Sequence, residues 1–191
     1  MLTKNNSKKF FFIFLTTHLF VWTLIPSLSN LNLPLDTIEA LAWGSDLKWG
    51  FNKHPPFSAF AVEVFYRLFS NQDWAYYLLS QIFIITAFFV IFKLGYEFFK
   101  NYHFAFLSVI LLEGIFFYNY TSPEFNVNIS QIPFWALSIY FSWRCLKYDK
   151  FFDYIFLGLF VSFGILSKYI FLYLAIGIKL MFIYFIYKKK K

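Results

Sequence analysis

The feature that most constrains the fold is a series of apolar runs separated by only brief polar breaks. The first run, FFFIFLTTHLFVWTLIPSL at 10–28, is long enough for a helix to cross a hydrocarbon core, which takes about twenty residues. The others lie at 74–96, 104–120, 131–146, 152–167 and 169–187. Only 14% of the residues are charged, against about 25% in soluble domains. The sequence therefore predicts one all-α membrane domain over 1–191, a polytopic bundle of about six spans that uses the lipid bilayer as its solvent.

Two features of these runs leave alternatives open. The run at 10–28 follows three lysines and could be a signal peptide, but its length and the following SLSNLNL, a poor small-residue cleavage site, favour an uncleaved anchor. The break at Lys168 is weak and could be only a kink. The spans at 104–120, 131–146 and 152–167 are short, so their ends must snorkel or shelter against neighbours.

Residues 29–73 carry too many charges and prolines for a span, so they form an extramembrane loop. Within this loop, 35–43 and 57–69 mix apolar and polar positions at near-helical spacing. We expect two short interfacial helices there, separated by a turn that Pro55 and Pro56 break.

The distribution of cations predicts the orientation. A net charge of +7 would suggest nucleic acid in a soluble protein, but here the cations stand at the ends of apolar runs, so we expect no nucleic-acid partner. Six spans with a cytoplasmic amino terminus put twelve cations inside and four outside. The loops at 29–73 and 121–130 then share the outer face. Cys145, the only cysteine, receives no role.

The first loop also holds the side chains best suited to chemistry. Asp36 and Glu39 stand three apart and so face the same way on a helix, and Lys48, Lys53 and His54 follow. A carboxylate that acts as a base and a cation that neutralises phosphate are the minimum for transferring a group from a lipid phosphate. A solvated loop with helix-compatible charges explains the same spacing.

A resemblance favours the first interpretation. LDTIEALAWGSDLKWGFNKHPPFSAF at 35–60 resembles the first periplasmic loop of GT-C glycosyltransferases, in the protein-mannosyltransferase and aminoarabinose-transferase branch (glycosyltransferase family 39). Those relatives carry an acidic pair, a W-G element and a K-H-P-P turn in this order. PEFNVNISQIPFWALSIYF at 123–141 and GILSKY at 164–169 are similar to two later elements of the family.

The resemblance implies an inverting sugar transferase that uses a polyprenyl-phosphate-linked donor on the outer face of the bacterial cytoplasmic membrane. It implies that an acidic residue of the first loop acts as a base or orients the acceptor, with Asp36 the first candidate for this catalytic role and Glu39 the second. It also implies that Lys53 contacts the donor phosphate and that His54 adds a hydrogen bond. No cofactor is expected. A divalent metal is compatible with some branches, but one Asp-x-x-Glu is poor support for it.

Other residues carry weaker interpretations. Four are candidates for binding substrate: Glu124, Asn126, Asn128 and Lys168. Helix capping explains the asparagines equally well, and snorkelling explains the lysine equally well. Glu113 and His18 lie inside apolar runs, where an ionisable group has to be paired or face a wet cavity. We expect the histidine to pack between helices.

The chain departs from the family in length, because the resemblance covers only the family's amino-terminal half. Three interpretations follow. The chain could be a fragment or truncated glycosyltransferase, an active enzyme that pairs with a second chain supplying the missing half, or a non-catalytic membrane protein such as a small transporter or assembly partner. We see no internal repeat of the kind transporters show. The sugar and its acceptor have no sequence signature here.

Overall fold

The computed structural model describes residues 4–189, which form eight α-helices and one 3₁₀ turn, with no strand in that range. The elements are α1 (Lys4–Ser29), α2 (Leu35–Gly44), α3 (Phe57–Phe69), α4 (Asp73–Phe99), α5 (Tyr102–Glu113), η1 (Phe116–Tyr118), α6 (Val127–Tyr148), α7 (Phe151–Ser167) and α8 (Phe171–Lys189). The predicted all-α membrane bundle is confirmed.

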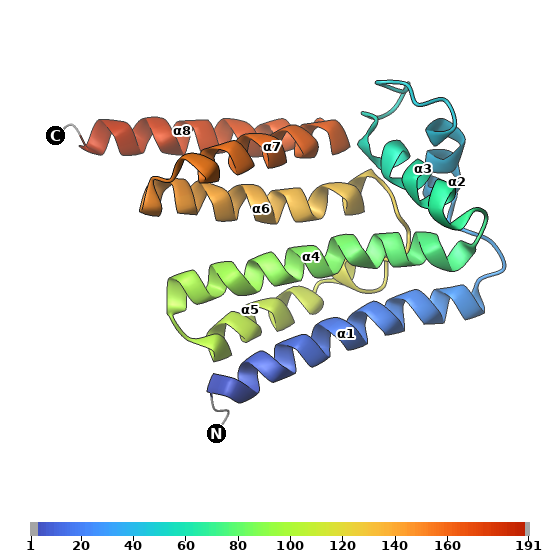
Figure 1. Cartoon of the computed structure of the whole chain (residues 1–191), viewed down its shortest axis with the longest axis horizontal. Coiled ribbons are helices and arrows are strands. Elements are labelled where there is room, and N and C mark those ends of the chain that lie inside the picture. Colours follow the sequence, from blue (N-terminus) through green and yellow to red (C-terminus); the bar gives the residue numbers. More distant parts are fainter. Residues whose placement is uncertain (1–3, 190–191) are drawn as a thin grey trace.

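Helices α1, α4, α5, α6, α7 and α8 run along the long axis, and α2 and α3 pack at one end of them (Figure 1). We call this the α2–α3 end. Helix α1 begins and α8 finishes at the opposite end, which we call the terminal end. The largest helix contacts join α6 to α7 and α4 to α1, α5 and α6, so α4 is the central helix. The chain runs back and forth, which brings loops distant in sequence to the same end.

Among the described residues, three helices have the length and apolar composition to cross a membrane: Asn6–Ser29, Asp73–Phe99 and Phe171–Lys189. The run predicted as a span at 104–120 is divided, because α5 ends at Glu113 and η1 follows. Ile115 is extended, and the Asn119 side chain donates to the Glu113 carbonyl at 2.5 Å. That bond satisfies one of the carbonyls a helix end leaves open. The number of crossings, six, stays a prediction.

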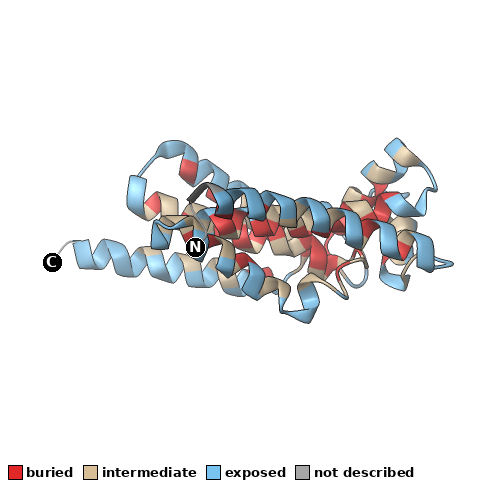
Figure 2. Ribbon diagram, turned by 90° about the horizontal axis from the view of Figure 1, so that it is seen from below, coloured by how far each residue is buried: buried red, intermediate tan, exposed pale blue. Residues whose placement is uncertain are grey.

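The outward-facing sides of the helices are exposed (Figure 2), and many of their exposed side chains are large and apolar. Phe12, Leu180 and Ile183 are each at least half exposed, and Phe171 is the only fully buried residue of α8 in the described range. The buried side chains instead line the inner faces, with Phe11, Ile84 and Phe88 at the centre. Apolar surface on this scale is stable only in contact with lipid.

The two short helices predicted in the first loop are present. Pro34 precedes α2, and Pro56 precedes α3, positions where a missing backbone N–H costs no helix bond. The helices cross closely at Gly44, where an added Cβ would lie 2.8 Å from the Ala59 carbonyl. The glycine of the W-G element therefore sets the distance between α2 and α3.

The break at Lys168 is a reversal rather than a kink. Helix α7 ends at Ser167, Lys168 is extended, and α8 begins at Phe171 and runs back (Figure 1). The Phe171 ring packs directly on Gly164, where an added Cβ would overlap it. Gly164 thus allows the hairpin that presents Lys168 at the α2–α3 end.

Gly164→Ala is expected to lower the free energy of unfolding by about 1–3 kcal/mol, the usual cost of overpacking a filled site. Thermal unfolding in detergent measures the change. Gly177→Ala is the matched control, because Gly177 has open space around the position of a Cβ and alanine favours a helix interior. Equal stability of the two variants would contradict the packing role of Gly164.

Candidate active site

A narrow cleft lies at the α2–α3 end between the loop at 29–73 and the start of α6. Asp36, Glu39, His54 and Asn126 all line it. The first three come from 35–54, and the last stands more than seventy residues later. The topology therefore brings the two predicted loops together at one site.

The acidic pair lies on α2 as its spacing predicts. Glu39 Oε1 accepts from Lys53 Nζ at 2.5 Å. This hydrogen bond and the attraction of the carboxylate raise the pKa of Lys53, and the charge of Asp36 raises it further. The ammonium is therefore fixed close to both acids. In residues 4–189, no hydrogen bond or ion pair engages the Asp36 carboxylate itself.

His54 lies on the cleft wall beside an aromatic pair. Trp43 stacks on Phe51 with their centroids 5.0 Å apart, and the His54 ring meets Trp43 edge-on at 6.0 Å. The Phe51 N–H donates to the His54 carbonyl at 3.1 Å, which closes the turn. Trp43 also lines the cleft. From the sequence, Trp43 was identified only as part of the W-G element. Its spacing of four residues from Glu39, which puts both side chains on one face of α2, was the only other signal.

The second loop is tied to α2 by two bonds. Glu124 Oε1 accepts from the Asp36 N–H at 3.2 Å, and Thr37 Oγ1 donates to the Phe125 carbonyl at 3.1 Å. Pro34, at the amino end of α2, offers no side-chain cap. A carboxylate placed there satisfies a free N–H and complements the helix dipole. Glu124, predicted as a possible substrate contact, thus braces the backbone of Asp36.

Asn126 and Asn128 open α6 but differ in their contacts. The Asn126 side chain accepts from the N–H groups of Asn128 and Ile129 at 2.9 and 3.1 Å, so it is a helix cap. Asn128 Oδ1 instead accepts from Lys168 Nζ at 2.5 Å. Lys168 therefore reaches the first turn of α6 and places a second cation at the α2–α3 end.

Buried polar side chains of α4 hold the second loop in place. Ser80 Oγ donates to the Ser122 carbonyl, and Gln81 Nε2 donates to Ser122 Oγ at 3.0 Å. All three residues are fully buried. Buried polar groups need such partners. These bonds to Ser122 were not predicted from the sequence, although adjacent serine and glutamine residues within an apolar run indicate buried polar contacts.

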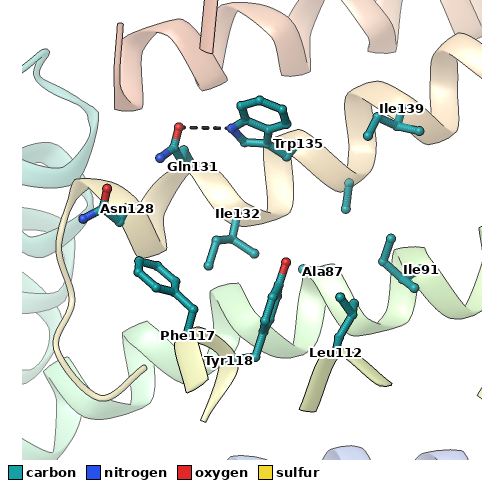
Figure 3. Close-up of a pocket in the computed structure, with 11 residues that line it drawn as sticks. Ala87, Ile91, Leu112, Phe117, Tyr118, Asn128, Gln131, Ile132, Trp135 and Ile139 are labelled. Carbon is teal, nitrogen blue, oxygen red and sulfur yellow. Dashed lines mark hydrogen bonds between the residues drawn. The ribbon is translucent and has the colours of Figure 1, made fainter. Parts of the chain in front are cut away.

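An apolar cavity of about 300 Å³ adjoins this site between α4, η1 and α6 (Figure 3). Asn128 and Gln131 line one end, and Gln131 Oε1 accepts from Trp135 Nε1 at 3.1 Å. The remaining wall is mostly aliphatic or aromatic, including Ile132 and Ile139. Because Asn128 also holds Lys168, the cavity has a cation near its polar end.

Two other ionisable residues pair away from the cleft. His18 Nδ1 lies 3.1 Å from Glu113 Oε2, close enough for an ion pair but without hydrogen-bond alignment. His18 is buried and meets the Phe88 ring edge-on at 5.1 Å. The pair joins α1 to the end of α5. Both residues therefore pack between helices, outside the cleft.

The structure groups the predicted residues into one cluster and one pair. Asp36, Glu39, Lys53, His54, Glu124 and Asn126 form the cluster, and Asn128 with Lys168 forms the pair. Within residues 4–189, no group of three or more His, Cys, Asp or Glu side chains could hold a metal ion. The expectation of no cofactor stays a prediction.

Comparison with known proteins supports the resemblance. A family model described as dolichyl-phosphate-mannose-protein mannosyltransferase matches residues 53–191. The match begins at Lys53 and includes the second loop and Lys168, while Asp36 and Glu39 precede it. No curated protein and no solved structure matches the chain.

Proposed function

Because the chain belongs to the dolichyl-phosphate-mannose-protein mannosyltransferase family, membrane glycosyltransferases of the GT-C type, we propose that it transfers a sugar from a polyprenyl-phosphate carrier to an acceptor hydroxyl. The reaction takes place at the α2–α3 end, which faces outward from a bacterial cytoplasmic membrane. The observation that carries the proposal is the Lys53–Glu39 ion pair beside the unengaged Asp36 carboxylate. This transfer requires a free base and a nearby cation, and here the base lines the cleft while the cation binds Glu39 at the cleft wall.

In the proposed step, the acceptor oxygen attacks the anomeric carbon as the bond from that carbon to the phosphate oxygen breaks. The acceptor proton passes to the Asp36 carboxylate. The bonding electrons leave with the phosphate, whose added negative charge the Lys53 ammonium stabilises. Attack opposite the leaving group inverts the configuration at the anomeric carbon.

Asp36 is the base rather than Glu39, because the Glu39 carboxylate already accepts a hydrogen bond from Lys53 while the Asp36 carboxylate is unengaged within the described residues. Glu39 instead holds Lys53 where the phosphate arrives. The Lys53 side chain remains 63% exposed, so a phosphate oxygen can reach the ammonium while Glu39 stays bound. Asn126 and His54 both line the cleft, and we expect them to contact sugar hydroxyls there.

The apolar cavity suits the first isoprene units of the carrier, because it adjoins the site and its walls are mostly hydrocarbon. Ile139→Trp is expected to narrow it and to raise KM about tenfold for a long-chain donor, through lost burial of about two methylene groups. A donor with a short alkyl tail should be unaffected. Ile155→Trp, on the exposed face of α7, is the control. An equal rise in KM for both donors would contradict this use of the cavity.

The experiment that tests the function uses the purified chain in lipid vesicles with polyprenyl-phosphate-linked mannose, labelled in the sugar, and candidate acceptors of lipid, polysaccharide and protein. We expect the label to leave the carrier and appear in one acceptor class. Because no other membrane protein is present, the assay also tests the need for a second chain. Label that stays on the carrier with every acceptor would contradict activity of this chain and favour the non-catalytic alternative.

A further inference from the structure

A second cavity, with charged residues among its mostly aromatic lining, lies at the terminal end, far from the cleft. It has a volume of about 350 Å³, and residues of α1, α4, α5 and α6 line it. Its cations are Lys8 of α1 and Lys93 of α4. In the sequence, these lysines indicated only the membrane topology.

Both ammonium groups are held over aromatic rings rather than carboxylates. Lys8 Nζ lies 4.2 Å from the centroid of Tyr102, and Lys93 Nζ lies 4.7 Å from that of Phe89. Every ion pair among the described residues uses another cation. Two positive charges therefore face one cavity without a carboxylate to neutralise them.

Glu97 is the only acid that lines this cavity in residues 4–189, and its charge is already matched. Glu97 Oε2 accepts from Lys147 Nζ at 2.7 Å, Lys100 Nζ at 3.0 Å and the Tyr148 hydroxyl at 2.9 Å. Neither of these lysines lines the cavity. The single negative charge of Glu97 is therefore already balanced by two lysines outside the cavity. Lys8 and Lys93 leave the cavity with an excess of positive charge.

The charged and apolar parts of the cavity lining are separated along the bundle axis, with the lysines nearer the terminal end and phenylalanine rings nearer the centre. Phe12 stands one turn after Lys8 on α1, and Phe89 stands one turn before Lys93 on α4, which runs the opposite way (Figure 1). Both rings therefore lie on the side of the lysines nearer the bundle centre. Phe12 is 54% exposed and Phe89 36%, so hydrocarbon can lie against them. Lys93 stands six residues before the end of α4, about 9 Å along the axis, so its long side chain can extend toward the polar end of the bundle.

We propose that this cavity binds the headgroup of an anionic phospholipid of the surrounding bilayer, with its phosphate between Lys8 and Lys93 and an acyl chain along Phe12 and Phe89. Basic pockets between helices are suited to such lipids. A free anion would gain nothing from the two exposed rings. The site is separate from the proposed catalytic cleft and does not depend on sugar transfer.

The test is native mass spectrometry of the purified chain titrated with phosphatidylglycerol or with phosphatidylcholine of the same acyl chains. The unaltered chain should bind phosphatidylglycerol more tightly. Lys8→Ala with Lys93→Ala should weaken that binding about 20- to 30-fold, from about fivefold for each cation, and leave phosphatidylcholine unchanged. Lys8→Arg with Lys93→Arg should retain it, which separates lost charge from lost fold.

Lys150→Ala with Lys188→Ala removes two exposed lysines at the same end and should leave phosphatidylglycerol binding intact. Equal weakening by this control, or full binding by the double alanine variant, would overturn the proposal. Inorganic phosphate or polyprenyl phosphate at the same concentration should not displace the phospholipid. Displacement by the first would identify a simple anion site, and displacement by the second a carrier site.

Discussion

Asp36→Asn is expected to lower the rate of sugar transfer by about 10²- to 10⁴-fold, the usual contribution of a general base. The amide is nearly isosteric with the carboxylate but cannot accept the acceptor proton. The bond between the Asp36 backbone N–H and Glu124, at 3.2 Å, does not use the side chain, so α2 should stay in place. The vesicle assay measures the rate, and the yield of folded protein should be unchanged.

Asp46→Asn is the matched control, because Asp46 is in the same loop and its carboxylate binds Lys48 at 2.7 Å outside the cleft. Its rate should stay within about twofold of the unaltered chain, since surface ion pairs contribute little. Full activity of Asp36→Asn would remove Asp36 from the mechanism. Similar losses in the two variants would point to the charge of the loop rather than to a base.

Local patterns predicted the first half of the site. Apolar spacing and the paired prolines placed helices at 35–43 and 57–69, and the structure has them at Leu35–Gly44 and Phe57–Phe69. The same helix spacing put Asp36 and Glu39 on one face. Counting cations put the loops at 29–73 and 121–130 at the same end, where contacts from Thr37 and Asp36 now join them. Short-range periodicity and topology were sufficient for these conclusions.

The remaining features depend on pairings that no local pattern encodes. The Ser80 and Gln81 bonds to Ser122 join residues more than forty positions apart, and the Lys168 bond to Asn128 spans forty. The predicted span at 104–120 is another case. Its apolar composition continues past Glu113, but Gly114 and the Asn119 side chain end the helix there. Hydropathy predicts whether a segment lies in lipid or in water, but it does not predict where the hydrogen bonds of a helix end.

Lys53→Ala is expected to lower the transfer rate about 10²- to 10³-fold, the usual loss when one electrostatic stabiliser of a developing anion is removed. The departing phosphate gains charge only as its bond to the sugar breaks, so the loss should fall mainly on kcat. Lys53→Arg keeps a cation and should recover much of the rate. Lys48→Ala removes a more exposed lysine of the same loop and should leave the rate unchanged.

The ion pair also predicts how pH acts on the rate. Glu39 raises the pKa of Lys53, so the ammonium persists at neutral pH and is lost only as pH rises through that raised value. In Glu39→Gln the pKa of Lys53 falls, and the alkaline loss of activity should move to lower pH while the neutral rate changes little. Were Glu39 the base instead, Glu39→Gln would reduce the neutral rate as severely as Asp36→Asn. The pH profiles of the two variants therefore assign the two acids of α2 to different tasks, proton acceptance and placement of the cation.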